Sequence, residues 1–166
     1  MSNENLLIKI NRWLSDLIQR ETNQHTKVTL FHGLEVPGIP MLDYLTRIVK
    51  YSGIDKSEII VGMLYFKTMR KLHRHFPCCE RSVHRTMLTL LLLATKMHRD
   101  DPASNQFFSR LGGIPPKELA RLERCALDLL NYSLFVSLDE YTQELSYWDA
   151  LWSFIALNQL ILMHIR

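Results

Sequence analysis

Three histidines and two cysteines lie within one short stretch, and these residue types are common metal ligands. They are His73, His75, Cys78, Cys79 and His84. Structural zinc sites usually draw on paired motifs such as C-x2-C, whereas this stretch reads H-x-H-x2-C-C-x4-H. Adjacent cysteines also seldom bind the same ion. The spacing therefore favours a solvated loop between two helices, and we expect neither a metal site nor a cofactor.

The same stretch carries the only dense group of basic side chains in the sequence. We call it the basic cluster, and its members are Arg70, Lys71, Arg74, Arg81 and Arg85. Glu80 is the only acidic residue within this stretch. One interpretation is a solvated helix end, where cations also suit the helix dipole. The other is a docking site for an acidic or phosphorylated segment of a partner protein.

Sequence signatures of catalysis are absent. The chain has no G-x-S-x-G, no P-loop, no H-E-x-x-H and no glycine-rich nucleotide loop. Asp100 and Asp101 form an acidic pair, but Pro102 follows and no further carboxylate lies nearby in the sequence. We therefore expect a protein that is not an enzyme and has no small-molecule substrate.

Lys96 and Glu123 lie on the two most apolar segments of the chain, where a charge is costly unless it reaches water or a partner. Each could extend its charged end to solvent from the side of a helix. Alternatively, the two side chains meet where their helices pack, and together present a lysine and a carboxylate to a partner.

The elements that position these residues are all predicted to be helical. The run from Met87 to Ala94 is apolar apart from Thr89, so its helix should be buried on most sides. Asp55 with Glu58, and Ser137 with Glu140, have the spacing of capping boxes. No alternating strand pattern of useful length appears, so the predicted class is all-α. The expected helices cover residues 3–19, 40–51, 55–75, 82–99, 105–111, 117–132 and 137–166, the last either continuous or bent near Ser146.

Composition narrows the class of protein further. The 166 residues are 47% hydrophobic and 22% charged, with a formal net charge of +3, which is typical of a globular protein and disfavours nucleic acid as a partner. Three cysteines do not make a disulfide framework, which favours a reducing compartment. The N-terminus does not read as a secretory signal. Only ten residues separate Arg85 from Lys96, too few to cross a membrane. We expect an intracellular protein of the cytoplasm, the nucleus or both.

Four motifs taken together resemble the cyclin box, and more narrowly that of the P- and U-type (phosphate-pathway-like) cyclins. They are IPMLDYLTRIVKY, SVHRTMLTLLLLATKMHRDD, NQFFSRLGGIPPKELARLE and LLNYSLFVS. They follow the family's order and spacing over residues 34–145. The resemblance implies a single five-helix cyclin box around a central apolar helix. Residues 1–33 then form an N-terminal helix and linker, and residues 146–166 a C-terminal helical extension.

The resemblance also implies a function and a set of contact residues. Cyclins bind and activate cyclin-dependent protein kinases. By position, Lys96 matches the lysine that contacts the mobile helix of the kinase, and Glu123 matches the glutamate that pairs with it. Met97, Leu127 and Tyr132 match apolar positions that face the kinase. The rival interpretations are a cyclin-fold module for transcription or nucleic-acid binding, and a scaffold without a kinase.

One departure from the family pattern concerns the second helix of the box. There the family usually has an aspartate that forms a salt bridge with an arginine of the first box helix, and this chain has Lys67. Without that bridge, we expect Lys67 to point to solvent.

The segment from Asp149 to Arg166 carries no charge between Asp149 and His164 and is apolar almost all round. Such a helix must be covered, either by its own box together with the N-terminal helix or by another chain. The complementary stripe of Trp13, Leu14 and Leu17 favours the first alternative.

Overall fold

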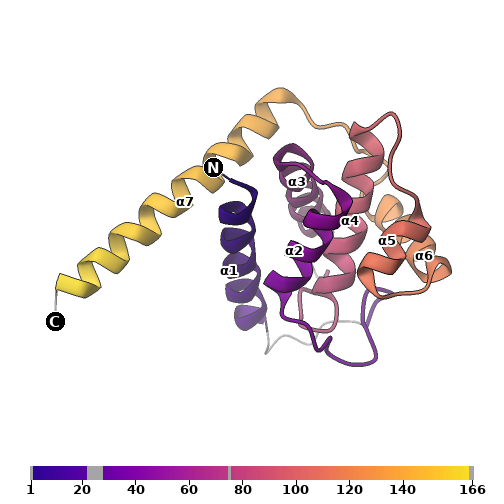
Figure 1. The fold of residues 1–166 in the computed structure, drawn as a ribbon, viewed down its shortest axis with the longest axis horizontal. Coiled ribbons are helices and arrows are strands. Elements are labelled where there is room, and N and C mark those ends of the chain that lie inside the picture. Colours follow the sequence, from indigo (N-terminus) through magenta and orange to yellow (C-terminus); the bar gives the residue numbers. More distant parts are fainter. Residues whose placement is uncertain (1, 22–27, 75, 165–166) are drawn as a thin grey trace.

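Seven α-helices make up the part of the chain that the structure, a computed structural model, describes (Figure 1). Residues 2–21, 28–74 and 76–164 are described, and their side chains as far as Leu151. No strand occurs among these residues, which confirms the predicted all-α class. The helices are α1 (Asn3–Glu21), α2 (Met41–Ser52), α3 (Lys56–Leu72), α4 (Val83–His98), α5 (Asn105–Gly112), α6 (Pro116–Leu129) and α7 (Leu138–His164).

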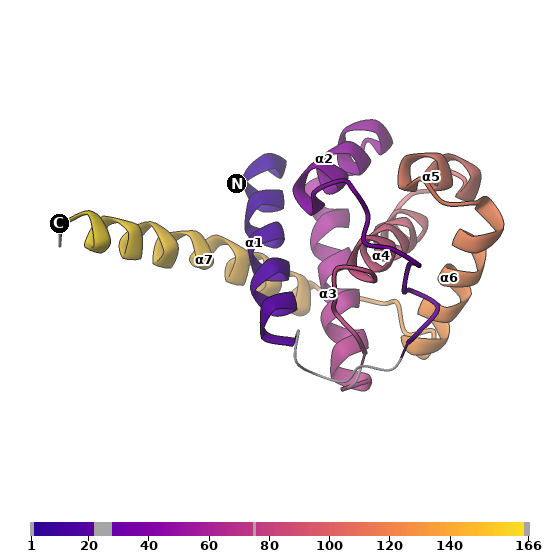
Figure 2. The ribbon, with the colours of Figure 1, turned by 90° about the horizontal axis from the view of Figure 1, so that it is seen from below.

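The central helix is α4, which contacts α2, α3, α5 and α6 (Figure 2). Every side chain from Thr86 to Thr95 is buried, as the apolar sequence predicts. The three threonines within this run are tolerated because each hydroxyl donates to a backbone carbonyl three or four residues earlier in the chain. Gly112 of α5 lies so close that a Cβ there would fall 2.1 Å from a methyl carbon of Leu88. This glycine therefore allows α5 to pack tightly on α4.

Several helix ends follow the predicted local signals. The Asp55 carboxylate accepts from the backbone N–H of Glu58 at 3.1 Å, and the Glu58 carboxylate accepts from the N–H of Asp55 at 2.9 Å. Gly53 ends α2 in the left-handed region, with φ of 65°. Ser82 lies at the predicted N-cap of α4 but makes no side-chain cap; its hydroxyl donates to the carbonyl of Pro77 instead.

Outside the central bundle, α1 packs against α2 and α7. Its buried side chains include Leu6, Leu7, Ile10 and Leu14. Trp13 of α1 meets the fully buried Trp148 of α7 edge-to-face, with ring centroids 6.1 Å apart. The first part of α7 therefore belongs to the folded body.

The expectation that Lys67 points to solvent is wrong. Its ammonium lies 2.7 Å from the Glu144 carboxylate, which is 7% exposed, and 3.9 Å from the ring centroid of Tyr147. The carboxylate also accepts from the indole N–H of Trp148 at 2.6 Å. The long stem of Lys67 reaches this partner on α7, which lies 77 residues away in the sequence, so no local pattern could indicate it.

The C-terminal helix is continuous, without a break near Ser146. Its ribbon runs past α1 and extends away from the other helices (Figures 1 and 2). Leu151 packs against the core. The prediction that the segment's apolar side chains are covered by the chain's own box concerns mainly residues 152–166, which lie outside the described side chains.

Candidate partner-binding site

Lys96 and Glu123 meet, and Asn105 completes the group. The Lys96 ammonium lies 2.5 Å from a Glu123 carboxylate oxygen and 2.6 Å from the Asn105 side-chain oxygen. The Asn105 amide donates to the other Glu123 oxygen at 2.7 Å. The three residues come from the end of α4, the start of α5 and the middle of α6. We call this closed set of contacts the Lys96 triad.

The contact between Lys96 and Glu123 bears on the two interpretations drawn from the sequence, although presentation of the pair to a partner stays a prediction. The side chains of Lys96 and Glu123 are 31% and 15% exposed, so neither simply extends its charge into water. An ammonium has three N–H donors, and Asn105 and Glu123 take two of them. The triad thus offers an oriented lysine donor and carboxylate at the surface.

The three apolar positions named from the resemblance lie on the same elements. Met97 follows Lys96 and is 50% exposed, Leu127 lies one turn after Glu123 and is half-buried, and Tyr132 follows α6 and is 64% exposed. A hydrogen bond from the Tyr132 hydroxyl to Asp128, 2.7 Å long, raises the pKa of Tyr132. Exposed apolar side chains beside an oriented ion pair suit a protein contact.

The backbone after α6 is held in an uncommon conformation. Asn131 and Tyr132 have φ values of 51° and 55°, in the left-handed region that non-glycine residues rarely adopt. Hydrogen bonds from the N–H of Asn131 to the Asp128 carbonyl and from that of Tyr132 to the Leu127 carbonyl maintain it. The helix end therefore fixes the backbone of Tyr132.

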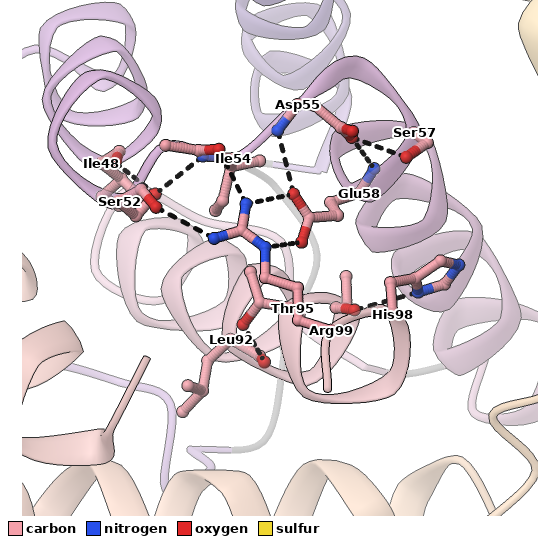
Figure 3. A network of polar contacts seen from close by, with 12 residues as sticks. Ile48, Ser52, Ile54, Asp55, Ser57, Glu58, Leu92, Thr95, His98 and Arg99 are labelled. Atoms are coloured by element: carbon pink, nitrogen blue, oxygen red, sulfur yellow. Dashed lines mark hydrogen bonds and ion pairs between the residues drawn. The ribbon is translucent and has the colours of Figure 1, made fainter. Parts of the chain in front are cut away.

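A polar network next to the triad fixes the end of α4 (Figure 3). The Arg99 guanidinium lies 2.5 and 2.6 Å from the two carboxylate oxygens of Glu58, and donates to the carbonyls of Ser52 and Gly53 at 3.2 and 2.7 Å. The Glu58 side chain is only 3% exposed. This network joins the end of α2, the start of α3 and the end of α4, and so orients the helix that carries Lys96.

Sequence reasoning missed the roles of Asn105 and Arg99. Asn105 opens a short helix, where a polar residue is unremarkable, and its two side-chain contacts lie 9 and 18 residues away. In the sequence, the capping box accounts for Glu58, but that motif uses only one of its two carboxylate oxygens. The bidentate pairing with Arg99, 41 residues on, had no local signal.

The basic cluster is partly neutralised within the chain. Arg70 pairs with Glu21, and Arg85 lies 2.5 Å from Glu118. The other three members, Lys71, Arg74 and Arg81, are exposed. A docking role for the whole cluster stays a prediction.

Two histidines of the same stretch contact backbone carbonyls. The Nε2 atoms of His73 and His84 lie 2.9 and 3.0 Å from the carbonyls of Leu129 and Ile39. Burial raises the pKa of Cys78 to about 12. Among the described residues, which do not include His75, no three potential metal ligands come together.

Comparison with known proteins agrees with this geometry. The family model for cyclins matches residues 5–134. The chain belongs to the cyclin family. The similar proteins include cyclins of both the U and the P type, in line with the resemblance drawn from the four motifs.

Three relatives illustrate the match. Cyclin-U4-1 of Arabidopsis thaliana is 32% identical over 133 residues, which are 80% of this chain and 66% of that protein. Cyclin-P3-1 of Oryza sativa subsp. japonica is 34% identical over 114 residues, 68% of this chain and 48% of the relative. PHO85 cyclin PHO80 of Saccharomyces cerevisiae is 27% identical over 140 residues, 80% of this chain and 48% of the relative. The chain thus spans about half to two thirds of the length of these proteins. Within the described residues, no helix is long and apolar enough to cross a membrane.

Proposed function

We propose that this chain is a regulatory subunit that binds a cyclin-dependent protein kinase and activates it, acting through binding rather than through catalysis. The observation that carries the proposal is the Lys96 triad. It lies at the two family positions expected to contact the kinase, and its donors and acceptors are already oriented in the isolated chain.

Activation would follow from differential affinity. A ligand shifts a conformational equilibrium only as far as it binds one state better than the other. An oriented lysine and carboxylate, flanked by Met97 and Leu127, would bind the mobile helix of the kinase in its inward position. That position assembles the Lys–Glu ion pair that kinases need for phosphoryl transfer.

The test is binding to a panel of cyclin-dependent kinases by pull-down and by titration. Lys96→Ala and Glu123→Ala should each weaken binding by about 2 kcal/mol or more, roughly 30-fold, because each removes a central anchor. Asn105→Ala should weaken it less, since Asn105 orients the pair. The matched control is Lys117→Ala, which removes an exposed lysine on α6 and should leave the affinity unchanged.

Thermal melts of each variant separate a binding defect from a folding defect. If Lys96→Ala and Glu123→Ala both remain folded and bind every kinase as the wild type does, the site assignment fails. Capture of a polynucleotide in place of a kinase would favour the nucleic-acid alternative. We also infer an intracellular location, which imaging of a fluorescent fusion would test.

A further inference from the structure

The second half of α7 continues beyond the helices that pack against its first half. We call residues 152–164 the distal segment of α7. Its sequence, WSFIALNQLILMH, is apolar apart from Ser153, Asn158, Gln159 and His164. Its ribbon extends away from the other helices in both views (Figures 1 and 2). A helix with apolar residues on nearly all sides needs a cover, so the question is what supplies it.

The stripe of α1 that the sequence offers as a cover is used by the first half of α7 and by the core. Trp13 packs edge-to-face on Trp148. Leu14 is 1% exposed, and Leu17 packs against the core. The Lys9 ammonium donates to the Trp148 carbonyl at 2.5 Å. The stripe is therefore filled before the distal segment begins.

Another apolar surface of α1 is open. A groove of about 440 Å³ lies between α1 and α2, and its apolar lining consists of Leu7, Ile8, Leu42 and Val49. Ile8 is 39% exposed. With 3.6 residues per turn, the α1 residues that line this groove lie on the side of the helix that faces away from Trp13. The α1–α2 groove is thus turned away from the α7 of its own chain.

The charges around the α1–α2 groove are complementary to those of the distal segment. Glu4 and Asp43 line the groove, are exposed, and form no ion pair with another described residue. Lys50 also lines it, but its ammonium lies over the ring of the next residue, 5.5 Å from the centroid. The distal segment has no acidic residue, and its end carries His164, with Arg166 shortly after. An apolar helix with a basic end suits an apolar groove with an acidic rim.

We propose that the distal segment of α7 docks in the α1–α2 groove of a second copy of this chain. The groove follows α2 from Leu42 to Lys50, about 12 Å at 1.5 Å per residue, so it can take about two turns of a helix. Each copy has one distal segment and one groove, and a reciprocal exchange therefore closes as a two-fold symmetric dimer. The groove belongs to α1 and α2, whereas the Lys96 triad belongs to α4, α5 and α6. The proposal therefore does not rest on kinase binding.

The first test measures the mass of the full chain by light scattering after size exclusion, at concentrations from about 1 to 100 µM. We expect a dimer that dissociates on dilution. Ile8→Glu places a charge in the groove and Leu160→Glu places one in the distal segment, and each should weaken dimerisation at least about tenfold. The controls are Tyr51→Glu on α2 and Leu138→Glu on α7, at positions 61% and 75% exposed that lie outside the groove and the distal segment. Both controls should dimerise as the wild type does, and circular dichroism checks that every variant is folded.

The second test mixes the two defective variants, each with a different affinity tag. The Ile8→Glu chain keeps its distal segment and the Leu160→Glu chain keeps its groove, so the mixture restores one of the two docked contacts. A mixed dimer should therefore form although neither variant dimerises alone. If Ile8→Glu dimerises as the wild type does, the groove is not the docking site. If the full chain is monomeric at the highest concentration, the distal segment is not covered by a second copy. Either result, or the absence of the mixed dimer, would overturn the proposal.

Discussion

Replacement of Lys67 by methionine tests the contact that joins α3 to α7. Methionine keeps most of the aliphatic stem and a similar helix propensity, so the substitution removes mainly the ammonium. The Glu144 side chain is 7% exposed in the wild type, and the substitution would leave its carboxylate with the Trp148 indole as its remaining partner. Breaking a buried ion pair from one side typically costs about 3–5 kcal/mol.

Two features of the structure change the expected cost of breaking the Lys67–Glu144 pair. Lys67 is itself 30% exposed, so water reaches the pair and lowers the cost of breaking it. The ammonium also lies 3.9 Å from the Tyr147 ring centroid, a cation–π contact worth about 0.5–1 kcal/mol at an exposed site. We expect a net loss of about 2–3 kcal/mol in the free energy of unfolding. For a chain of this size, that corresponds to a fall of about 4–12 °C in Tm.

The assay is urea unfolding of the isolated chain, followed by tryptophan fluorescence and circular dichroism. Lys71→Met is the matched control, because Lys71 lies one turn further along α3 and is exposed; we expect a change below about 0.5 kcal/mol. The double variant Lys67→Met/Glu144→Gln should lose less than the sum of the single variants, with a coupling of about 1–2 kcal/mol. A loss below about 0.5 kcal/mol in the free energy of unfolding of Lys67→Met would refute the reasoning. It would indicate that the Lys67 ammonium is solvated rather than paired.

Three further predictions concern the network beside the triad and the turn before α4. Arg99→Met should cost about 2–3 kcal/mol in urea unfolding, because it leaves the buried Glu58 carboxylate without its cation; a change within 0.5 kcal/mol would contradict this. Asp55→Ala should cost about 1 kcal/mol at pH 7 through loss of the cap. Burial opposes ionisation of Asp55, yet hydrogen bonds from Ser57 and the Glu58 N–H outweigh it and lower the Asp55 pKa. The difference between wild type and Asp55→Ala should therefore shrink as the pH falls below about 4, and a constant difference down to pH 2 would be inconsistent with the cap. Cys78 should react with iodoacetamide at pH 8 far more slowly in the folded chain than in urea, since burial raises its pKa to about 12; mass spectrometry of the labelled peptides would show equal rates if this is wrong.

Local signals in the sequence were enough to predict the helices and several of their ends. Asp55 with Glu58, and Gly53 after α2, act within three or four residues, so their effect does not depend on the rest of the fold. The run from Met87 to Ala94 in α4, apolar apart from Thr89, likewise predicts burial on most sides. The resemblance to cyclins also placed Lys96 and Glu123 as a pair, which residue spacing alone left open.

Only the tertiary structure decided which charges meet across the fold. Lys67 finds Glu144 and Arg99 finds Glu58 at separations of 77 and 41 residues, where chain order carries no information on proximity. The Nε atom of Arg47, buried and without a hydrogen-bond partner among the described residues, is likewise apparent only once the helices are packed. A long, flexible cationic side chain can reach water or any of several partners at similar cost, so its choice depends on the packing of helices that the sequence pattern does not place.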